Sequence, residues 1–145
     1  MIYGVEKKNY SELIEVWEAS LRATHDFLPE KEIEPLKALL LDQYFDAVVL
    51  KCFKNKQGKI TGFCGVADKK IEMLFIMPSA QGQGVGSALC QHAIEHENAT
   101  RVDVNEQNTR AIDFYKKMGF IVVARSDFDE QGRPYPLLNM EKSVS

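Results

Sequence analysis

A glycine-dense segment between a β-type run and a helical run constrains the fold of this chain more than any other feature. Residues 81–86 read Gln-Gly-Gln-Gly-Val-Gly, so three glycines alternate with other residues within six positions. The run before it, residues 71–77, is rich in apolar β-type side chains and ends at Pro78, and residues 85–96 place their apolar side chains on one helical face. The sequence therefore predicts a strand, a tight loop and a helix in direct succession.

Such a loop is suited to holding an anion. Glycine lets the backbone approach a ligand closely, and the N–H groups and positive dipole end of the following helix favour phosphate or pyrophosphate. A dinucleotide fingerprint is disfavoured because the interval to its third glycine is too short here. A nucleotide P-loop is disfavoured because no lysine occurs between Lys70 and Lys116. On spacing alone, a glycine-rich turn without a ligand remains the alternative.

The rest of the pattern alternates strands and helices and predicts an α/β fold with a mixed sheet. A helix is expected to open at Asn9, with Glu12 completing a capping box, and Pro35 is expected to start or kink the next helix. Further helices are expected over residues 85–96 and 108–118, with Gly119 as the stop of the second. Strands are expected over residues 1–5, 47–53, 60–67, 71–77, 101–104, 121–124 and 137–140.

Length and composition exclude several classes of protein. The 145 residues suit a single domain, 1–145, and no repeat or linker marks an internal boundary. The net charge is -3 and no basic stretch is long enough to bind nucleic acid, so nucleic acid is not an expected partner. No run approaches the roughly 18 apolar residues of a membrane span, and the start lacks a signal sequence, so a cytoplasmic location without a membrane partner is expected.

The three cysteines are expected to be buried thiols. Cys52, Cys64 and Cys90 are odd in number, widely spaced and set in apolar stretches. In that setting a thiol behaves as a small apolar group. The sequence therefore predicts neither a disulfide nor a metal site.

A second motif narrows the kind of protein to which the glycine loop belongs. Residues 108–120 read Asn-Thr-Arg-Ala-Ile-Asp-Phe-Tyr-Lys-Lys-Met-Gly-Phe, which resembles the N-x-x-A-x-x-F-Y-x-x-x-G-F signature of the GCN5-related N-acetyltransferase (GNAT) family at every fixed position. Residues 81–86 resemble the Q/R-x-x-G-x-G/A motif of the same family, and residues 73–78 resemble its strand ending in proline. Two motifs in the expected order are far more specific than either alone.

The resemblance covers nearly the whole chain and is weakest over residues 20–43, where family members vary because that region builds the acceptor pocket. It implies the acyl-CoA N-acyltransferase fold, a mixed and mostly antiparallel twisted sheet flanked by helices. It also implies an enzyme that moves an acetyl group from acetyl-CoA to an amine. A non-catalytic acyl-CoA-binding module, such as a sensor or a subunit, is the alternative.

The resemblance also implies which residues hold the coenzyme. The backbone of Phe75 and Ile76 is expected to pair with the pantetheine amides, as an added strand would. The pyrophosphate is expected to receive N–H groups from Gln81, Gly82, Gly84, Gly86 and Ser87. Asn105 and Asn108 resemble positions that touch the coenzyme arm, although Asn105 also fits a turn and Asn108 a helix cap.

Tyr115 resembles the general acid of the family. A phenol with a pKa near 10 is protonated at neutral pH and can donate a hydrogen bond to the departing thiolate, although the position also fits a core tyrosine. Glu72 resembles a position where family members often carry a carboxylate that acts as base, directly or through water, and it also fits a solvated strand residue. His25 and Asp26 are the second candidates for the base, or line the acceptor pocket.

The sequence leaves the acceptor open among antibiotics, polyamines, amino acids, peptide N-termini and protein lysines. By elimination, the acceptor is expected beside residues 24–28 and 127–135, opposite the coenzyme, with His25, Asp26 and Tyr135 as contacts. The chain is expected to act as a monomer or a homodimer.

Overall fold

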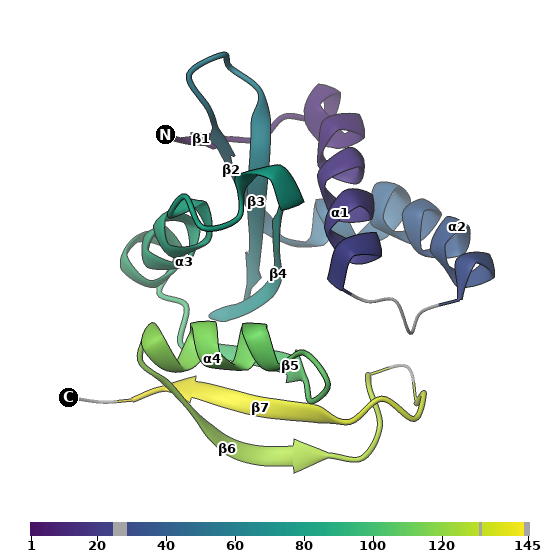
Figure 1. Cartoon of the computed structure of the whole chain (residues 1–145), viewed down its shortest axis with the longest axis vertical. Coiled ribbons are helices and arrows are strands. Elements are labelled where there is room, and N and C mark those ends of the chain that lie inside the picture. Colours follow the sequence, from purple (N-terminus) through teal and green to yellow (C-terminus); the bar gives the residue numbers. More distant parts are fainter. Residues whose placement is uncertain (25–28, 131, 144–145) are drawn as a thin grey trace.

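A single seven-stranded sheet forms the framework of the protein (Figure 1). The structure, a computed structural model, describes residues 1–24, 29–130 and 132–143. In the order β1-β2-β3-β4-β5-β7-β6, the strands are β1 (Ile2–Gly4), β2 (Val49–Lys54), β3 (Ile60–Ala67), β4 (Lys70–Ile76), β5 (Arg101–Asn105), β7 (Leu137–Lys142) and β6 (Phe120–Ser126).

Helices cover both faces of this sheet. In the part of the chain that the structure describes, the α-helices are α1 (Tyr10–Thr24), α2 (Glu30–Leu39), α3 (Val85–His96) and α4 (Thr109–Lys117). Short helical segments occupy Lys7–Asn9, Leu40–Tyr44, Phe45–Ala47 and Pro78–Ala80. Helices α1 and α2 lie on one side of strands β2 to β4 and α3 lies on the other (Figure 1). Among the described residues, no helix is both long and apolar enough to cross a bilayer.

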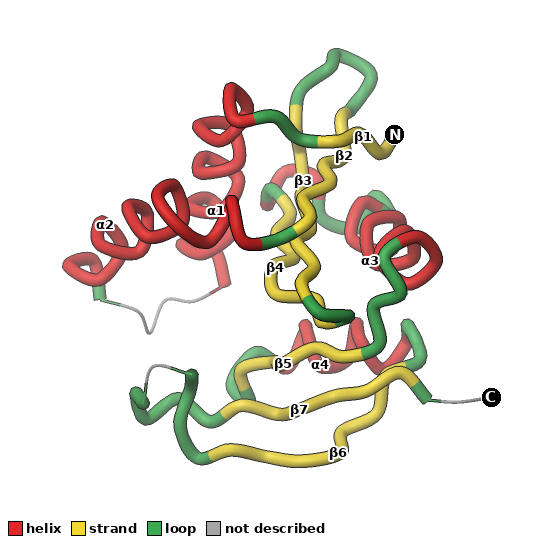
Figure 2. Tube along the Cα trace, turned by 180° about the vertical axis from the view of Figure 1, so that it is seen from behind, coloured by secondary structure: helices red, strands yellow, loops and turns green. Residues whose placement is uncertain are grey.

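The strand pairing confirms the predicted fold class. Every neighbouring pair is antiparallel except β4 and β5, which run parallel. That parallel pairing joins only Lys70 with Arg101 and Ile71 with Val102. Beyond it the strands part, and Figure 2 shows β5 and β4 running in very different directions. The sheet therefore opens between β4 and β5 instead of continuing flat.

Strand β4 also carries a bulge on its other edge. Val66 of β3 pairs with Ile71, and Gly65 pairs with Met73, so Glu72 is the extra residue that has no direct partner. A bulge of this kind bends a strand and re-aims the side chains around it. Glu72 therefore lies at an irregular point of β4, directly after the last residues that pair with β5.

Two apolar clusters, one on each face, hold the helices to the sheet. The cluster under α1 and α2 includes Leu13, Trp17, Phe45 and Phe63, and the cluster under α3 and α4 includes Leu89, Cys90, Tyr115, Phe120 and Met140. Burying a large apolar side chain contributes about 1.5 to 3 kcal/mol, so these clusters dominate the stability of the framework. All three cysteines are buried and free, as predicted.

One local prediction needs correction, and of the two roles predicted for Pro35 the start of a helix is excluded. The capping box was expected between Asn9 and Glu12, but it lies one turn earlier, where the Asn9 side chain accepts the N–H of Glu6 at 3.0 Å. A short 3₁₀ turn over Lys7–Asn9 precedes α1, so the same asparagine closes the turn instead of opening the helix. Pro35 lies inside α2, which ends at Leu39 and passes into a wider π-type turn.

Candidate active site

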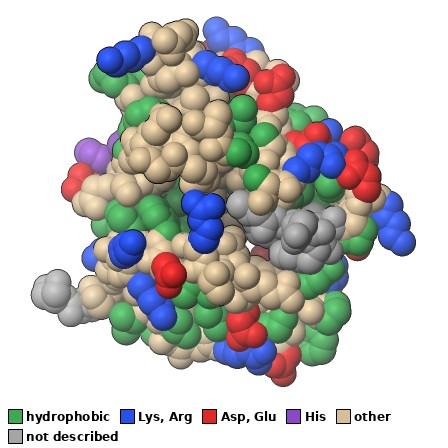
Figure 3. All heavy atoms as spheres, viewed as in Figure 1, with side chains coloured by type: hydrophobic (Ala, Val, Ile, Leu, Met, Phe, Trp, Pro, Cys, Tyr) green, Lys and Arg blue, Asp and Glu red, His purple; other side chains and the backbone are tan. Residues whose placement is uncertain are grey.

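A cavity of about 420 Å³ occupies the opening between β4 and β5. Its walls are β4, β5, the glycine loop and the start of α4. All of the predicted coenzyme-binding residues line it, namely Phe75, Ile76, Gln81, Gly82, Gly84, Gly86, Ser87, Asn105 and Asn108, and so do Glu72 and Tyr115. Figure 3 shows the surface hollowed between the upper part of the molecule and the layer formed by β5 to β7. The structure thus brings eleven predicted site residues, from different parts of the chain, to one place.

The glycine loop has the backbone that only glycine adopts readily. Gly82 and Gly84 have φ angles of 78° and 83°, and Gly84 is the N-cap of α3. A Cβ atom at either position would meet nothing within 4 Å, so the space beside both is open. The amides of Gly86 and Ser87, in the first turn of α3, have no acceptor within the helix. The loop therefore offers an anion an open approach to several N–H donors.

Gln81 differs from the other loop positions. Its N–H already donates to the carbonyl of Pro78 at 3.3 Å, closing the short helical turn that follows β4. Among the five predicted pyrophosphate contacts, Gln81 thus has the amide that is least available to a ligand.

The edge of β4 that faces the cavity is unpaired over most of its length. On its other edge, Phe75 pairs with Phe63 and Ile76 with Gly62 of β3. On the β5 side, the pairing stops at Ile71. A strand edge with free amide and carbonyl groups can bind an extended ligand that carries amides of its own.

Tyr115 is a buried residue that nevertheless reaches the cavity wall. Its ring makes edge-to-face contacts with Phe114 and Phe120, at centroid distances of 5.1 and 5.6 Å. Burial raises the pKa of Tyr115 well above its ordinary value, and the neighbouring thiols of Cys90 and Cys64 add to the effect. The phenol is therefore a hydrogen-bond donor throughout the physiological pH range, and transfer of its proton is more costly than for an exposed tyrosine.

The two asparagines hold the backbone at the start of α4. The Asn108 side chain accepts the N–H of Ala111 at 3.1 Å, which confirms its predicted cap role. The Asn105 side chain accepts the N–H of Gln107 at 2.8 Å, and its carbonyl accepts the N–H of Asn108 at 2.9 Å. Both predicted local roles are therefore present, while contact with a coenzyme arm stays a prediction.

A second cavity of about 290 Å³ lies on the other side of β4. It shares Glu72, Met73, Phe75 and Asn105 with the first cavity, so these residues form a common wall. Most of its remaining lining is apolar or aromatic and comes from α1, α2 and neighbouring segments: Trp17, Leu21, Leu36, Leu40, Tyr44 and Leu137. Its polar side is formed by the loop before β7, including the predicted acceptor contact Tyr135.

Glu72 lies where the two cavities meet. About a third of its side chain is exposed, and burial of the rest raises its pKa. The nearby ammonium of Lys70 opposes this shift, whereas the carboxylates of Glu130 and Asp103 add to it. A carboxylate with a raised pKa at a cavity wall is a typical proton acceptor in enzymes.

Arg133 crosses the rim of the second cavity. Its guanidinium donates to Asp129 at 2.9 Å, lies 3.5 Å from the carboxylate of Glu32 on α2, and sits over the ring of Tyr135. The loop before β7 is thereby joined to α2 across the cavity.

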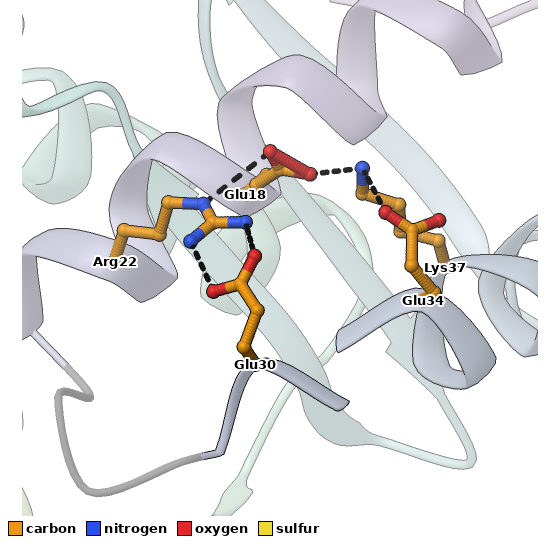
Figure 4. A network of polar contacts seen from close by, with 5 residues as sticks. All are labelled: Glu18, Arg22, Glu30, Glu34 and Lys37. Atoms are coloured by element: carbon orange, nitrogen blue, oxygen red, sulfur yellow. Dashed lines mark hydrogen bonds and ion pairs between the residues drawn. The ribbon is translucent and has the colours of Figure 1, made fainter. Parts of the chain in front are cut away.

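Charged side chains also fix α1 relative to α2, which together form the apolar wall (Figure 4). Arg22 donates to both oxygens of Glu30 at 2.7 Å and to Glu18 at 3.4 Å, and Lys37 contacts Glu18 and Glu34. We call these five residues the α1–α2 charge network. Exposed ion pairs contribute little stability individually, but a bidentate pair within a network restricts geometry.

Some predicted site residues are not described by the structure, and some residues that line the cavities were not predicted. His25 and Asp26 lie outside the described residues, so their predicted roles stay predictions. The sequence did not identify the apolar wall from α1 and α2, because its side chains have the same spacing as ordinary core residues. It also missed Arg110, which stands at a variable position of the second motif and lines the first cavity, and Lys70, whose ammonium lies near Glu72.

Comparisons with known proteins agree with this arrangement. The family described as "Acetyltransferase (GNAT) domain" matches residues 34–144. The peptidyl-lysine N-acetyltransferase YjaB of Salmonella typhimurium is 38% identical over 143 residues, which are 97% of this chain and 98% of that protein. The solution structure of apo YjaB from Escherichia coli has a TM-score of 0.86 at 35% identity and covers 100% of this chain and 98% of its own.

A more distant structure shares the fold. The PaiA N-acetyltransferase of Thermoplasma acidophilum, in complex with coenzyme A, has a TM-score of 0.74 at 20% identity and covers 99% of this chain and 98% of its own. Taken with the family match and the 38% identity to YjaB, the chain belongs to the GCN5-related N-acetyltransferase family and is an acetyltransferase.

Proposed function

We propose that this protein transfers an acetyl group from acetyl-CoA to the side-chain amine of a lysine residue in a protein. One observation carries the proposal: the two cavities meet at a common wall formed by Glu72, Met73, Phe75 and Asn105. A donor in one cavity and an acceptor in the other would therefore have their reacting atoms side by side, with a carboxylate between them. Holding two reactants in this way removes much of the entropic barrier to their reaction.

The residues of the first cavity fit acetyl-CoA. The open glycine loop at the start of α3 suits the pyrophosphate, and the unpaired edge of β4 suits the amide-bearing pantetheine arm. Tyr115 lines the same cavity and keeps its proton, so its hydroxyl is a donor for the sulfur end. A phosphate site, an amide-binding edge and a hydrogen-bond donor thus line one cavity.

The second cavity supports a lysine side chain as acceptor. Its apolar wall suits the aliphatic stem of lysine, which can lie along apolar surface while its amine reaches a polar group. Glu72 supplies that polar group at the common wall. The relatives in Salmonella typhimurium and Escherichia coli named peptidyl-lysine N-acetyltransferase support the same acceptor class.

When bound, acetyl-CoA supplies a thioester whose carbonyl carbon forms the new C–N bond while the C–S bond breaks. Deprotonating a lysine ammonium at pH 7 costs about 5 kcal/mol, so a base has much to contribute. Glu72 accepts one proton from the lysine nitrogen and passes it to solvent. The nitrogen loses a second proton, which ends on the coenzyme sulfur. The Tyr115 hydroxyl donates a hydrogen bond to that sulfur as it leaves.

The acceptor class can be tested with paired peptide libraries. One library has blocked N-termini and a single free lysine, and the other has the same sequences with that lysine acetylated and the N-terminus free. We expect coenzyme A release and a mass increase on the lysine nitrogen in the first library, and a rate at least about tenfold lower in the second. The reverse preference would leave the acetyltransferase assignment standing and overturn the lysine proposal.

The pyrophosphate site predicts a binding defect in Gly84→Val. A β-branched side chain at φ 83° is strained, and it would project into the open space where the ligand approaches. We expect the Kd for coenzyme A, measured by calorimetry, to rise by about tenfold or more. Gly58→Val is the matched control, because Gly58 has a φ of 80° and equally open space but lies in the β2–β3 turn. Unchanged affinity in Gly84→Val would contradict the site.

A chemical role for Tyr115 predicts that Tyr115→Phe separates turnover from binding. The substitution keeps the ring contacts with Phe114 and Phe120 and removes only the hydroxyl donor. We expect kcat to fall by about 10²-fold while coenzyme A affinity and the melting temperature hold. Tyr3→Phe, at an exposed position of β1, serves as the control. Wild-type turnover in Tyr115→Phe would reduce Tyr115 to a core residue.

The role of Glu72 as base predicts a particular pH dependence. A base works only when deprotonated, so kcat/KM should rise with pH through the pKa of Glu72, which burial places above the usual glutamate value. In Glu72→Gln we expect that rise to disappear and kcat/KM at neutral pH to fall by about 10²-fold. A later rise from the amine itself should remain. Glu15→Gln, on the exposed side of α1, should keep both rises, and a retained first rise in Glu72→Gln would point to another base.

A further inference from the structure

Lys70 is a half-buried lysine that faces carboxylates from three segments. It is the first residue of β4, and its side chain is only 18% exposed. Its ammonium lies 2.5 Å from Asp103 on β5, 2.8 Å from Glu130 in the loop before β7, and 3.8 Å from Glu72 on its own strand. The Lys70 ammonium thus joins β4 and β5, which border the opening, to the loop before β7.

Lys70 lies where β4 and β5 are still joined, so its contacts affect how both strands are placed. It belongs to the two residue pairs that hold β4 and β5 together before the strands part. Asp103 is held from its other side, because it accepts a hydrogen bond from Asn139 of β7 at 2.7 Å. The loop that carries Glu130 also carries Asp129 and Arg133, which bond to each other, and Arg133 reaches Glu32 of α2. Lys70 therefore contacts three of the segments around Glu72, namely β4, β5 and the loop before β7.

We propose that Lys70 is a positioning residue for acetyl transfer, whose ammonium fixes the Glu72 carboxylate at the common wall and sets the pH range in which that carboxylate accepts a proton. The proposal rests on the proposed role of Glu72 as base. It adds a residue that touches neither donor nor acceptor and acts only through Glu72 and the loop.

The balance of charge around Glu72 determines the direction of the effect. The cations that face it are Lys70 and Arg101, and the anions are Glu130 and Asp103. Like charges raise the pKa of a carboxyl and opposite charges lower it. Without Lys70, the carboxylates of Glu72, Glu130 and Asp103 would lie close together and, of the two cations, Arg101 alone would remain, so the pKa of Glu72 would rise further. The base would then be protonated, and inactive, up to a higher pH.

Lys70 itself is unsuited to be the base. Burial favours its neutral form, but the hydrogen bonds to Asp103 and Glu130 outweigh burial, and the pKa of Lys70 is raised above its usual value. Its ammonium therefore stays protonated at neutral pH and has no free electron pair to accept a proton. Its influence on the reaction is electrostatic and geometric.

The first test measures the carboxyl group directly and needs no acceptor. The full chain is labelled at the glutamate carboxyl carbons, and the Glu72 signal is assigned as the one lost in Glu72→Gln. In Lys70→Met, we expect the titration midpoint of Glu72 to move up by about one pH unit by NMR. Lys70→Arg should keep the wild-type midpoint. Lys59→Met, which removes the same charge beside the β2–β3 turn, should also leave it unchanged.

The second test is kinetic. The acid side of the kcat/KM profile of Lys70→Met should move up with the carboxyl midpoint, so the rate below the wild-type midpoint falls by about tenfold and recovers at higher pH. Lys70→Arg should restore the profile. A purely structural role would instead lower the rate at every pH.

A variant that shifts the Glu72 midpoint in the opposite direction keeps the test decisive if Lys70→Met does not fold. Glu130 is exposed, and Glu130→Gln removes an anion near Glu72 while leaving Lys70 in place. We expect it to lower the Glu72 midpoint. An unmoved midpoint in both Lys70→Met and Glu130→Gln, or in Glu130→Gln alone if Lys70→Met does not fold, overturns the proposal. So does a moved midpoint with an unmoved rate profile.

Failure of the proposed function has a different signature. If Glu72→Gln retains the wild-type rate profile, Glu72 is not the base, whatever its midpoint does in the Lys70 variants. If the Glu72→Gln profile changes as expected but Lys70→Met matches wild type, only the role of Lys70 is wrong.

Discussion

The parting of β4 and β5 after two residue pairs is the constraint on which the rest of the site depends. An ordinary sheet would continue the parallel ladder and bury the β4 edge against its neighbour. Here the ladder stops at Ile71, and the amide and carbonyl groups that follow border a cavity. Unpaired backbone groups away from water are costly, so such an edge is stable when solvent or a ligand pairs with it. A ligand with an extended chain of amides suits that requirement.

Carboxylates as well as unpaired backbone groups gather beside the opening, and Lys70 offsets the repulsion between these carboxylates. Glu72 lies at a bulge beside the opening, with Asp103 and Glu130 close by. Carboxylates gathered on a half-buried surface repel one another unless a cation lies among them. Lys70 is at the closed end of the opening, so a residue that holds β4 and β5 together before they part also balances the charges beside the opening. Strand geometry and acid–base chemistry therefore depend on the same few residues.

The sequence predicted what is determined locally. The strand, glycine loop and helix follow one another without interruption, and Asn108 caps α4 as its position before a helical run suggests. Gly119, with a φ of 99°, follows the end of that helix as predicted. Local signals failed where one residue suits two structures. Asn9 could open a helix or close the turn before it, and in the structure its side chain closes the turn.

What the sequence could not show depends on contacts between distant segments. Trp17 and Leu36 have the periodicity of core residues, and only the placement of α1 against α2 reveals that they border a cavity. Lys70 stands just before the strand expected over residues 71–77, and nothing in the sequence indicated its contacts because Asp103 and Glu130 come from segments far along the chain. Pairwise charge contacts of this kind leave no periodic pattern, whereas helices and strands do.

Both cavities rest on buried apolar clusters, but the second is also joined at its edge by ion pairs. The first cavity stands on the cluster that includes Val85, Leu89 and Tyr115, where a change of volume disturbs packing throughout. The second cavity is lined in part by Trp17, Leu21 and Leu40 of the other apolar cluster. Exposed or half-exposed ion pairs, such as Arg22 with Glu30 and Arg133 with Glu32, join its outer segments. Such pairs contribute little to stability, so their loss does not threaten the fold. Under the proposed function, the outer segments of the acceptor cavity can therefore change in sequence, and with them the choice of amine, while the coenzyme cavity keeps its geometry.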